Sequence, residues 1–469
     1  MSSEAEKSRS LLVGTIIYAI GNFGTKILSF LIVPLYTYYI EPSDMGNLDL
    51  INTTVSLLSP LITMKISDAA YKWMIQDESN NQDYISAAIK LLFRNCLFCI
   101  IFLCILKFFV PIWKFYYFLP MLIMDRILEC FQKLLRGLKK QKLYAVTGIL
   151  YTAIYLLLNV IRVVYFNQGV TALLQNSIIS QVIVIIVILL FEKRIRNIKI
   201  LNNYKKLQHE MLSYSIPLVP SALNWWVMSA SDRYIIKFFL GSAANGIYAV
   251  AYKFPSVLST IFAMFNNSWT DMILSDMDTD NNSKDYYTKI FEQFYRLSFG
   301  LILVLIPATK IVTNLILSEA YKTASTYIAF LYLGTVFQGF SSFYSVGYLR
   351  GGKTKRAATT SIYGAVVNIL IDLFFIKYLG LFAAALSTFL GFFTMWIMRV
   401  KDTKGVLPIE IHKIRFLLYL IACIVLSCFM IISEIKIEII LFIILLIWFM
   451  VDNKKMLRSI IRKMINRKK

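Results

Sequence analysis

This chain of 469 residues has little charge and almost no histidine. Asp, Glu, Lys and Arg together make up 16% of it, and only two histidines occur, whereas soluble domains carry about 25% charged residues. No polar stretch is long enough for a soluble domain, and no cluster outside the apolar segments has the spacing of zinc ligands. These shortages exclude a soluble enzyme and a zinc protein, and we expect no cofactor.

We expect neither a disulfide framework nor a signal peptide in this chain. All six cysteines lie inside apolar segments, where they act as small hydrophobic residues. The first apolar segment, about residues 11–39, is longer than the 7–15 residues of a signal-peptide core and has no small-residue cleavage site. We expect it to be a spanning helix.

Apolar segments long enough to cross a bilayer make up most of the chain. Hydrophobic residues account for 58% of it, and a spanning helix needs about 20 mostly apolar residues. The pattern predicts an all-α membrane protein with about 14 transmembrane helices. The expected ranges are 11–39, 45–66, 86–110, 113–135, 144–166, 170–191, 212–240, 246–275, 288–316, 323–349, 357–377, 380–399, 414–433 and 436–451.

The net charge of +22 is distributed as in a membrane protein rather than a nucleic-acid-binding one. With the N-terminus in the cytoplasm, the inner segments hold about 33 Lys and Arg and the outer loops about 5. This bias predicts that both termini are cytoplasmic in a bacterial inner membrane, and it excludes nucleic acid as a partner.

An internal repeat relates two parts of the chain. Residues 38–58, YYIEPSDMGNLDLINTTVSLL, align without gaps on residues 238–258, FFLGSAANGIYAVAYKFPSVL, at an offset of 200, so that Gly46 falls on Gly246. In both copies an odd-numbered helix meets an even-numbered one, as in transporters built from two parallel repeats. We expect a six-helix lobe over 1–210, a second over 211–400, and two extra helices with a basic tail over 401–469.

One motif match is set aside. Residues 347–354, GYLRGGKT, fit the P-loop pattern, but that pattern binds phosphate only between a strand and a helix. Here it joins two predicted spanning helices, so we interpret it as a basic cytoplasmic turn.

Charged residues inside apolar segments are the candidate functional residues, because charge in a bilayer is costly. Lys26 lies near the middle of the first segment. Asp49, a turn or two into the second, is either its partner or a hydrated carboxylate at the helix end. Asp232 and Arg233 lie on the seventh helix and Lys253 on the eighth, at depths that permit a structural Asp232–Lys253 pair.

Two further groups of charges are open to more than one interpretation. Lys237 is only one turn from the end of its helix and is expected to reach the interface. Asp125, Arg126 and Glu129 cluster in the middle of the fourth helix, and Arg126 and Glu129 are spaced to pair. This cluster is either structural or lines a pathway.

Three stretches carry a family resemblance. The run DRYIIKFFLGSAANGIYAVAYKF at 232–254 resembles the opening of the second half of bacterial polysaccharide flippases, members of the multidrug/oligosaccharidyl-lipid/polysaccharide exporter superfamily. The stretch GTIIYAIGNFGTKILSFLIVPLYTYYIEPSDMG at 14–46 is similar to the start of that family, and SVGYLRGGKTK at 345–355 to its basic turn.

The resemblance implies two six-helix lobes around a cavity lined by helices 1, 2, 7 and 8. It also implies alternating-access transport of an undecaprenyl-pyrophosphate-linked oligosaccharide from the cytoplasmic to the periplasmic leaflet, with possible proton or sodium coupling. Lys26, Arg233 and Lys253 would then bind the pyrophosphate, with Asp232 orienting Arg233 and Asp49 nearby. A polysaccharide polymerase and glycosyltransferases would be partners, beside the lipid bilayer.

Three alternatives remain. A drug antiporter of the same superfamily would need excess carboxylate in the cavity, whereas the four cavity helices carry a net charge of about +2. A lipid II flippase would also have a cationic cavity. A membrane enzyme of polysaccharide assembly would need catalytic residues near an interface, and the outer loops are short.

Overall fold

The structure, a computed structural model, describes residues 24–26, 28–77, 79–110, 112–199, 203–275 and 283–454. These residues are almost entirely helical, and the described ranges contain no strand. They divide into two compact units. Unit 1 runs to Lys237 and includes Gly241–Gly246, and unit 2 comprises Phe238–Leu240 and the residues from Ile247 onward.

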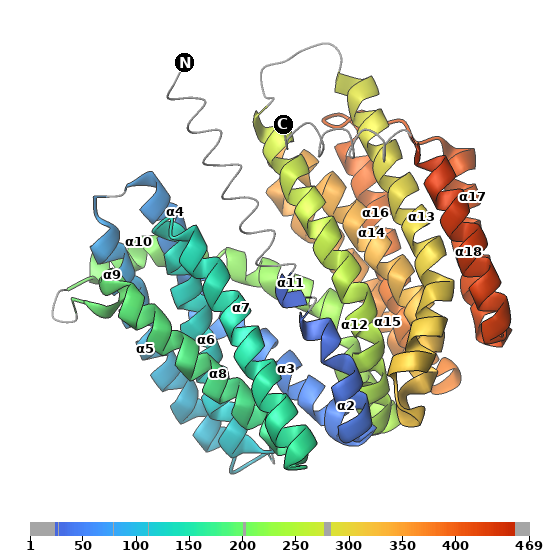
Figure 1. Ribbon diagram of the computed structural model, residues 1–469. Helices are drawn as coiled ribbons and strands as arrows, with labels where there is room; N and C mark the ends of the chain where they lie inside the picture. Colours follow the sequence, from blue (N-terminus) through green and yellow to red (C-terminus); the bar gives the residue numbers. More distant parts are fainter. Residues whose placement is uncertain are drawn as a thin grey trace, which may run out of the picture. The chain divides into compact units, whose positions relative to one another are not determined.

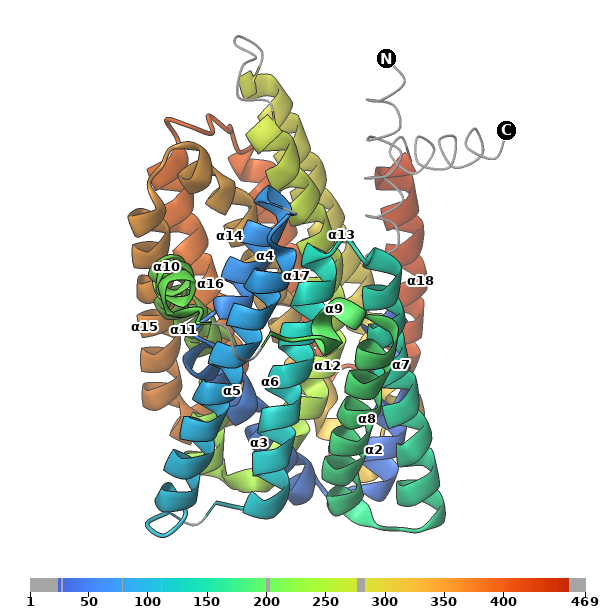
Figure 2. The same cartoon turned by 90° about the vertical axis from the view of Figure 1, so that its left-hand side faces the viewer.

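Unit 1 is a helical bundle in which α6, α7 and α8 run side by side (Figures 1 and 2). Its helices are α2 (Val33–Tyr39), α3 (Pro42–Thr63), α4 (Ile66–Gln76), α5 (Asn81–Leu106), α6 (Phe115–Gly137), α7 (Gln141–Asn159), the π-helix η1 (Val160–Tyr165), α8 (Gly169–Phe191), α9 (Lys193–Arg196), α10 (Lys205–Ser215) and α11 (Leu218–Ala230).

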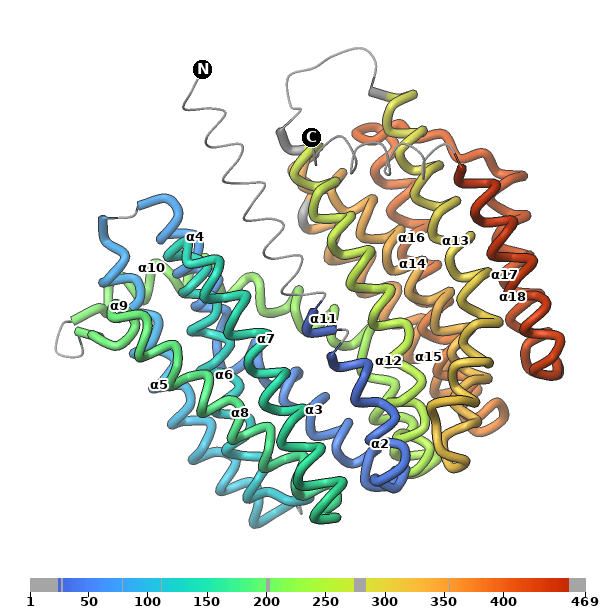
Figure 3. The backbone as a smooth tube through the Cα atoms, viewed as in Figure 1, coloured from blue at the N-terminus to red at the C-terminus, as the bar shows by residue number. Residues whose placement is uncertain are grey.

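Two features of unit 1 differ from the expected helices. The range 212–240 is not one helix, because the chain turns at Ile216 and Pro217 and again at Ser231. Proline lacks the amide that a helix interior requires, which accounts for the first break. The resulting α10 packs on α4 and α5 and lies at a steep angle to α5 and α6 (Figure 3). The second difference is α4, which occupies a range expected to be a cytoplasmic loop.

Unit 2 is a bundle in which α16 packs between α14 and α15, and α13 packs against α17 and α18. Its helices are most of α12 (Asp232–Ser275), α13 (Ser283–Ile316), the 3-10 helix η2 (Glu319–Ala324), α14 (Ser325–Arg350), α15 (Thr354–Leu379), α16 (Leu381–Thr403), α17 (Lys413–Ile432) and α18 (Ile435–Asp452). Aromatic rings from α13, α14, α16 and α17 form its core. The ring centroids of Phe340 and Phe299 lie 5.5 Å apart, and those of Trp396 and Phe416 lie 5.0 Å apart.

The helix α12 contains the junction of the two units. Its backbone departs from helical geometry at Gly241, with φ of 88° and ψ of 176°, so two helices meet there at a kink. Positive φ strains any residue with a Cβ atom, and glycine relieves that strain. The expected boundary lay at residue 211, and the structure instead groups the residues up to Lys237 with unit 1. The six-helix division stays a prediction.

The chain is a multi-pass membrane protein. The described part contains eight helices long and apolar enough to cross a membrane, the last of them α17. Most residues of each of the fourteen expected segments are helical in the described ranges, with the first described only from residue 24 onward and 212–240 interrupted by turns. Phe98 and Phe102 of α5 and Ile440 and Ile447 of α18 are exposed, as expected of apolar side chains that face lipid.

Candidate functional site

The main candidate site is a buried ion cluster in unit 1, where α3 meets the start of α12. Nε of Arg233 lies 2.9 Å from Oδ2 of Asp49, and Nη1 lies 3.1 Å from Oδ1 of Asp232. The side chains of Arg233, Asp232 and Asp49 are 8%, 4% and 18% exposed. Two carboxylates therefore hold one guanidinium away from solvent.

Neutral groups complete the surroundings of this cluster. Nη1 of Arg233 also donates to the carbonyl of Ser229, one turn back along the chain, at 3.0 Å. The buried amide of Asn245 donates to the carbonyl of Gly46 at 2.9 Å and reaches Oδ2 of Asp49 at 3.5 Å. The bond to Ser229 orients the guanidinium, and the amide of Asn245 gives Asp49 a second donor, as a buried ion pair requires.

The helices beside the cluster meet at two glycines. A Cβ atom on Gly46 would lie 1.8 Å from the carbonyl oxygen of Ser242, and one on Gly246 would lie 1.9 Å from that of Pro42. The obstacles are backbone atoms, so neither position tolerates a larger residue without movement of a helix. Gly46 and Gly246, and likewise Pro42 and Ser242, are pairs at the repeat offset of 200. The contact therefore has the symmetry of the repeat.

The other predicted site residues are placed as follows. Lys26 lies in the helical stretch before α2 with its side chain exposed, and among the described residues it makes no hydrogen bond or ion pair. Asp49 thus pairs with Arg233 rather than with Lys26. Lys253 is half-buried on α12 in unit 2. The exposed Lys237 donates to Asn47 at 3.2 Å and to Ser242.

Polar side chains of α3 and α11 extend the site. Nε1 of Trp226 donates to the carbonyl of Thr53 at 3.0 Å and to the hydroxyl of Ser56 at 3.1 Å. The hydroxyls of Tyr234 and Thr54 lie 2.7 Å apart. Sequence reasoning missed these neutral groups because such residues are ordinary within an apolar helix. The one sequence feature that could have pointed to them is that Trp225 and Trp226 lie within two helical turns of Asp232 along the chain.

The charges of α6 form a second polar cluster in unit 1. Arg126 is buried and pairs with both Asp125 and Glu129 on its own helix. Nζ of Lys133 lies 3.4 Å from Glu129 and 2.8 Å from Asp68 on α4. The predicted Arg126–Glu129 pair is present, within a chain of alternating charges that the sequence did not reveal.

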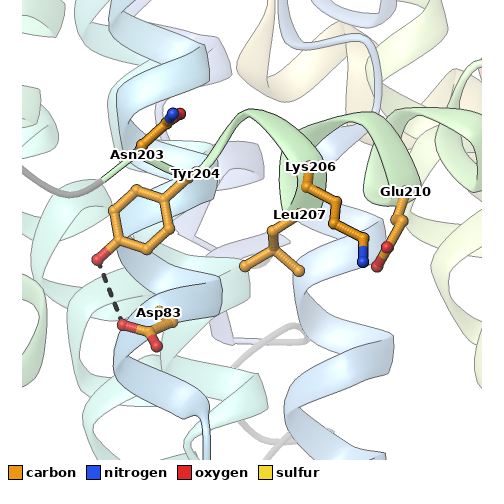
Figure 4. Close-up of a pocket in the computed structure, with 6 residues that line it drawn as sticks. All are labelled: Asp83, Asn203, Tyr204, Lys206, Leu207 and Glu210. Atoms are coloured by element: carbon orange, nitrogen blue, oxygen red, sulfur yellow. Dashed lines mark hydrogen bonds between the residues drawn. The ribbon is translucent and has the colours of Figure 1, made fainter.

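A shallow pocket lies at the end of unit 1 that we expect to face the cytoplasm (Figure 4). It has a volume of about 610 Å³ and is lined by Asp83, Asn203, Tyr204, Lys206, Leu207 and Glu210. The phenol of Tyr204 donates to Asp83 at 3.2 Å. In the loop before α5, hydrogen bonds from Ser79 and Asn80 lower the pKa of Asp77 to about 2. The pocket is open and polar, unlike a closed ligand site.

Comparison with solved structures finds the fold of this chain in two membrane proteins. The lipid II flippase MurJ, in an inward closed conformation, superimposes with a TM-score of 0.71 at 16% identity over 94% of this chain and 100% of that chain. An inward-facing multidrug resistance MATE family transporter of the MOP superfamily gives 0.63 at 10% identity, over 82% and 94% of the two chains. At such identities the likeness establishes the all-α membrane fold alone.

The amino-acid sequence of this chain matches one curated relative and one protein family. An uncharacterized membrane protein of Methanocaldococcus jannaschii is 23% identical over 303 residues, which cover 61% of this chain and 57% of that protein. The match thus spans little more than half the length of this relative. The family described as polysaccharide biosynthesis protein matches residues 11–270, more than half of the chain. The chain therefore belongs to the polysaccharide biosynthesis protein family.

Proposed function

We propose that this protein is an alternating-access flippase that moves undecaprenyl-pyrophosphate-linked oligosaccharide units from the cytoplasmic to the outer leaflet of a bacterial inner membrane. The observation that carries the proposal is the family match over residues 11–270, combined with a fold shared with a lipid flippase. Both named structural relatives are transporters. The oligosaccharide would serve the assembly of a surface polysaccharide such as an O-antigen or capsule.

The charges in unit 1 support an anionic substrate group. Lys26 is an exposed ammonium within the first apolar segment, without a carboxylate partner among the described residues. Leaving such a charge in a membrane is costly unless a ligand or water meets it. We assign the first contact with the pyrophosphate to Lys26, with Arg233 as a further cation in unit 1, and a role for Lys253 stays a prediction.

Arg233 has a different role within this site from that of Lys26. In the structure Asp49 and Asp232 already neutralise it, so a phosphate oxygen must compete with a carboxylate for the guanidinium. Exchange of partners would be a way for substrate binding to loosen the contact between α3 and α12. Asp232 orients Arg233, and Asp49 is the carboxylate that the pyrophosphate displaces.

A lipid II flippase is the second candidate, favoured by the TM-score of 0.71 to MurJ. Both candidates move a polyprenyl pyrophosphate, so the charges of the site do not separate them. The drug antiporter is disfavoured because the exposed Lys26 would repel cationic drugs.

Deletion of the protein tests the proposal. The expected result is loss of surface polysaccharide with normal growth, and accumulation of lipid-linked units on the cytoplasmic leaflet. Cell lysis with stranded lipid II would support the second candidate instead. Normal polysaccharide with new sensitivity to cationic dyes would support drug export and overturn both.

A further inference from the structure

The α6 cluster of unit 1 ends in a carboxylate, Asp125, whose charge is compensated only in part by its neighbours. Asp125 shares the guanidinium of Arg126 with Glu129, and Glu129 has Lys133 as a second cation and the hydroxyl of Ser59 as a donor at 3.0 Å. Asp125 has no second cation among the described residues. It is therefore the carboxylate of the cluster that loses its charge at the least cost.

The amide of Gln181 on α8 is the partner of Asp125 across the bundle. Its Nε2 donates to Oδ1 of Asp125 at 3.2 Å. Gln181 is 1% exposed, and its Oε1 has no hydrogen-bond donor in the described part of the chain. An unsatisfied buried acceptor is costly, and a proton on Asp125 would supply the missing donor once the amide turns over. Gln181 can thus keep one hydrogen bond to Asp125 in either protonation state, as donor to the carboxylate or as acceptor from the carboxylic acid.

We propose that Asp125 binds the proton that couples transport, and that Gln181 positions the Asp125 carboxyl group through a hydrogen bond. The proton forms an O–H bond at the Asp125 carboxylate, Arg126 then pairs with Glu129 alone, and the proton leaves to water when the bond breaks. The charge of the cluster changes by one unit while its other pairs persist. This inference rests on the proposed function for its transport step, but not for the binding of the proton.

The elements packed on α6 contribute few other ionisable groups near Asp125. The phenol of Tyr151 on α7 interacts electrostatically with Asp125, and the thiol of Cys96 on α5 interacts with Arg126. On α4, Asp68 reaches the cluster only through Lys133, and α8 has no charged residue at all. Among the described residues, no carboxylate on these neighbouring helices contacts Asp125 directly, and Glu129 on α6 itself is compensated by Arg126, Lys133 and Ser59.

Polar groups connect Asp125 to both ends of unit 1. Toward the expected cytoplasmic end run Glu129, Lys133 and Asp68, whose side chain is one-third exposed. Toward the other end, the buried polar face of α8 continues to the exposed Gln168. It consists of Gln181, Ser180, Ser177 and Asn176. Tyr151 lies 3.3 Å from Ser177, and Arg162 joins Asn176 and Gln168 at 2.8 Å each. A row of this kind gives water and protons polar partners across an otherwise apolar bundle.

Infrared difference spectroscopy on the purified full-length protein tests the proton site without any substrate. Lowering the pH from about 8 to about 5.5 leaves ordinary carboxyl groups ionised, since their pKa is about 4. We expect a protonated-carboxyl band to appear in the wild type, to vanish in Asp125→Asn and to persist in Asp125→Glu. The matched control is Asp77→Asn, which removes a carboxyl whose pKa is about 2 and should leave the band intact. Equal bands in wild type and Asp125→Asn would overturn the proposal.

Proteoliposomes separate this inference from the flippase proposal. The probe is a fluorescently labelled undecaprenyl-pyrophosphate oligosaccharide, with a gradient of about one pH unit that changes proton activity tenfold. Wild-type flipping should rise toward about tenfold with the gradient, and Asp125→Asn flipping should not respond. Flipping that ignores the pH gradient, or follows a sodium gradient alone, would overturn coupling at Asp125 and leave the flippase standing. A proton band without any flipping would leave the proton site standing and refute the flippase.

Discussion

Arg233 and Asp49 form an ion pair of 2.9 Å between α12 and α3, and Asp232 holds the same guanidinium from the other side. The two helices approach so closely at Gly46 and Gly246 that backbone meets backbone. The Arg233 cluster is therefore both a candidate site for an anion and a joint between two repeat-related helices. These two roles have different experimental consequences.

Removal of the arginine should destabilise the protein. Arg233→Ala removes the guanidinium that Asp49 and Asp232 share, and breaking a buried pair by removing one partner costs about 3–5 kcal/mol. Arg233→Lys should recover part of the lost stability, because lysine keeps the positive charge but lacks the several N–H donors of the planar guanidinium. Thermal unfolding of the purified protein in detergent measures the effect. Lys26→Ala is the matched control, and equal unfolding temperatures for Arg233→Ala and Lys26→Ala would refute the structural role.

The glycine contact should tolerate no added methyl group. Gly46→Ala and Gly246→Ala each place a Cβ atom within 2 Å of a carbonyl oxygen, so we expect loss of transport and a lower unfolding temperature. Gly405→Ala serves as the control because nothing lies within 4 Å of its Cβ position. Comparison of detergent-extracted yield and surface polysaccharide in the three variants checks this. Wild-type behaviour of both site variants would show that the helices do not meet there.

The exposed Lys26 should matter for transport and not for stability. A hydrogen bond between charged groups contributes about 1.5–3 kcal/mol, so Lys26→Ala should lower the flipping rate about tenfold or more. Lys26→Arg should keep partial activity because the charge is retained. Lys237→Ala should have a smaller effect, since Lys237 bonds to Asn47 and Ser242 near the helix end. Full transport by Lys26→Ala at matched protein levels would remove Lys26 from the site.

The positive-inside distribution predicts the topology. Reporter fusions after Lys206 and after Lys355 should both report cytoplasm, and so should fusions at either terminus. A periplasmic signal at one of these positions would invalidate the orientation and the helix count derived from it.

The sequence predicted the helical membrane fold well, because apolar length alone decides which segments cross a bilayer. It was less informative where a polar or proline-containing stretch interrupts helix. The short α4 escaped notice because Asp68 and Lys72 make it look like a loop, and the break at Pro217 was hidden within a long apolar range.

The sequence singled out Asp49, Asp232 and Arg233 and associated Asp232 with Arg233, but it did not pair Asp49 with Arg233. Asp49, Asp232 and Arg233 attract attention because charge is rare in a spanning helix. The partner of Asp49 comes from a different part of the chain, and spacing along one helix cannot reveal it. The same limit applies to Gln181, because the sequence shows an amide within the apolar α8 but not that it bonds to Asp125.

The most direct test of the central claim is the leaflet in which the lipid-linked oligosaccharide resides. Spheroplasts of deletion cells, complemented with wild type, Lys26→Ala or an empty vector, can be probed with a lectin that reaches only the outer leaflet. We predict lectin-accessible lipid-linked oligosaccharide with wild type, and lectin-inaccessible material with the empty vector and with Lys26→Ala. Equal accessibility in all three strains would contradict the assignment of this protein as the flippase.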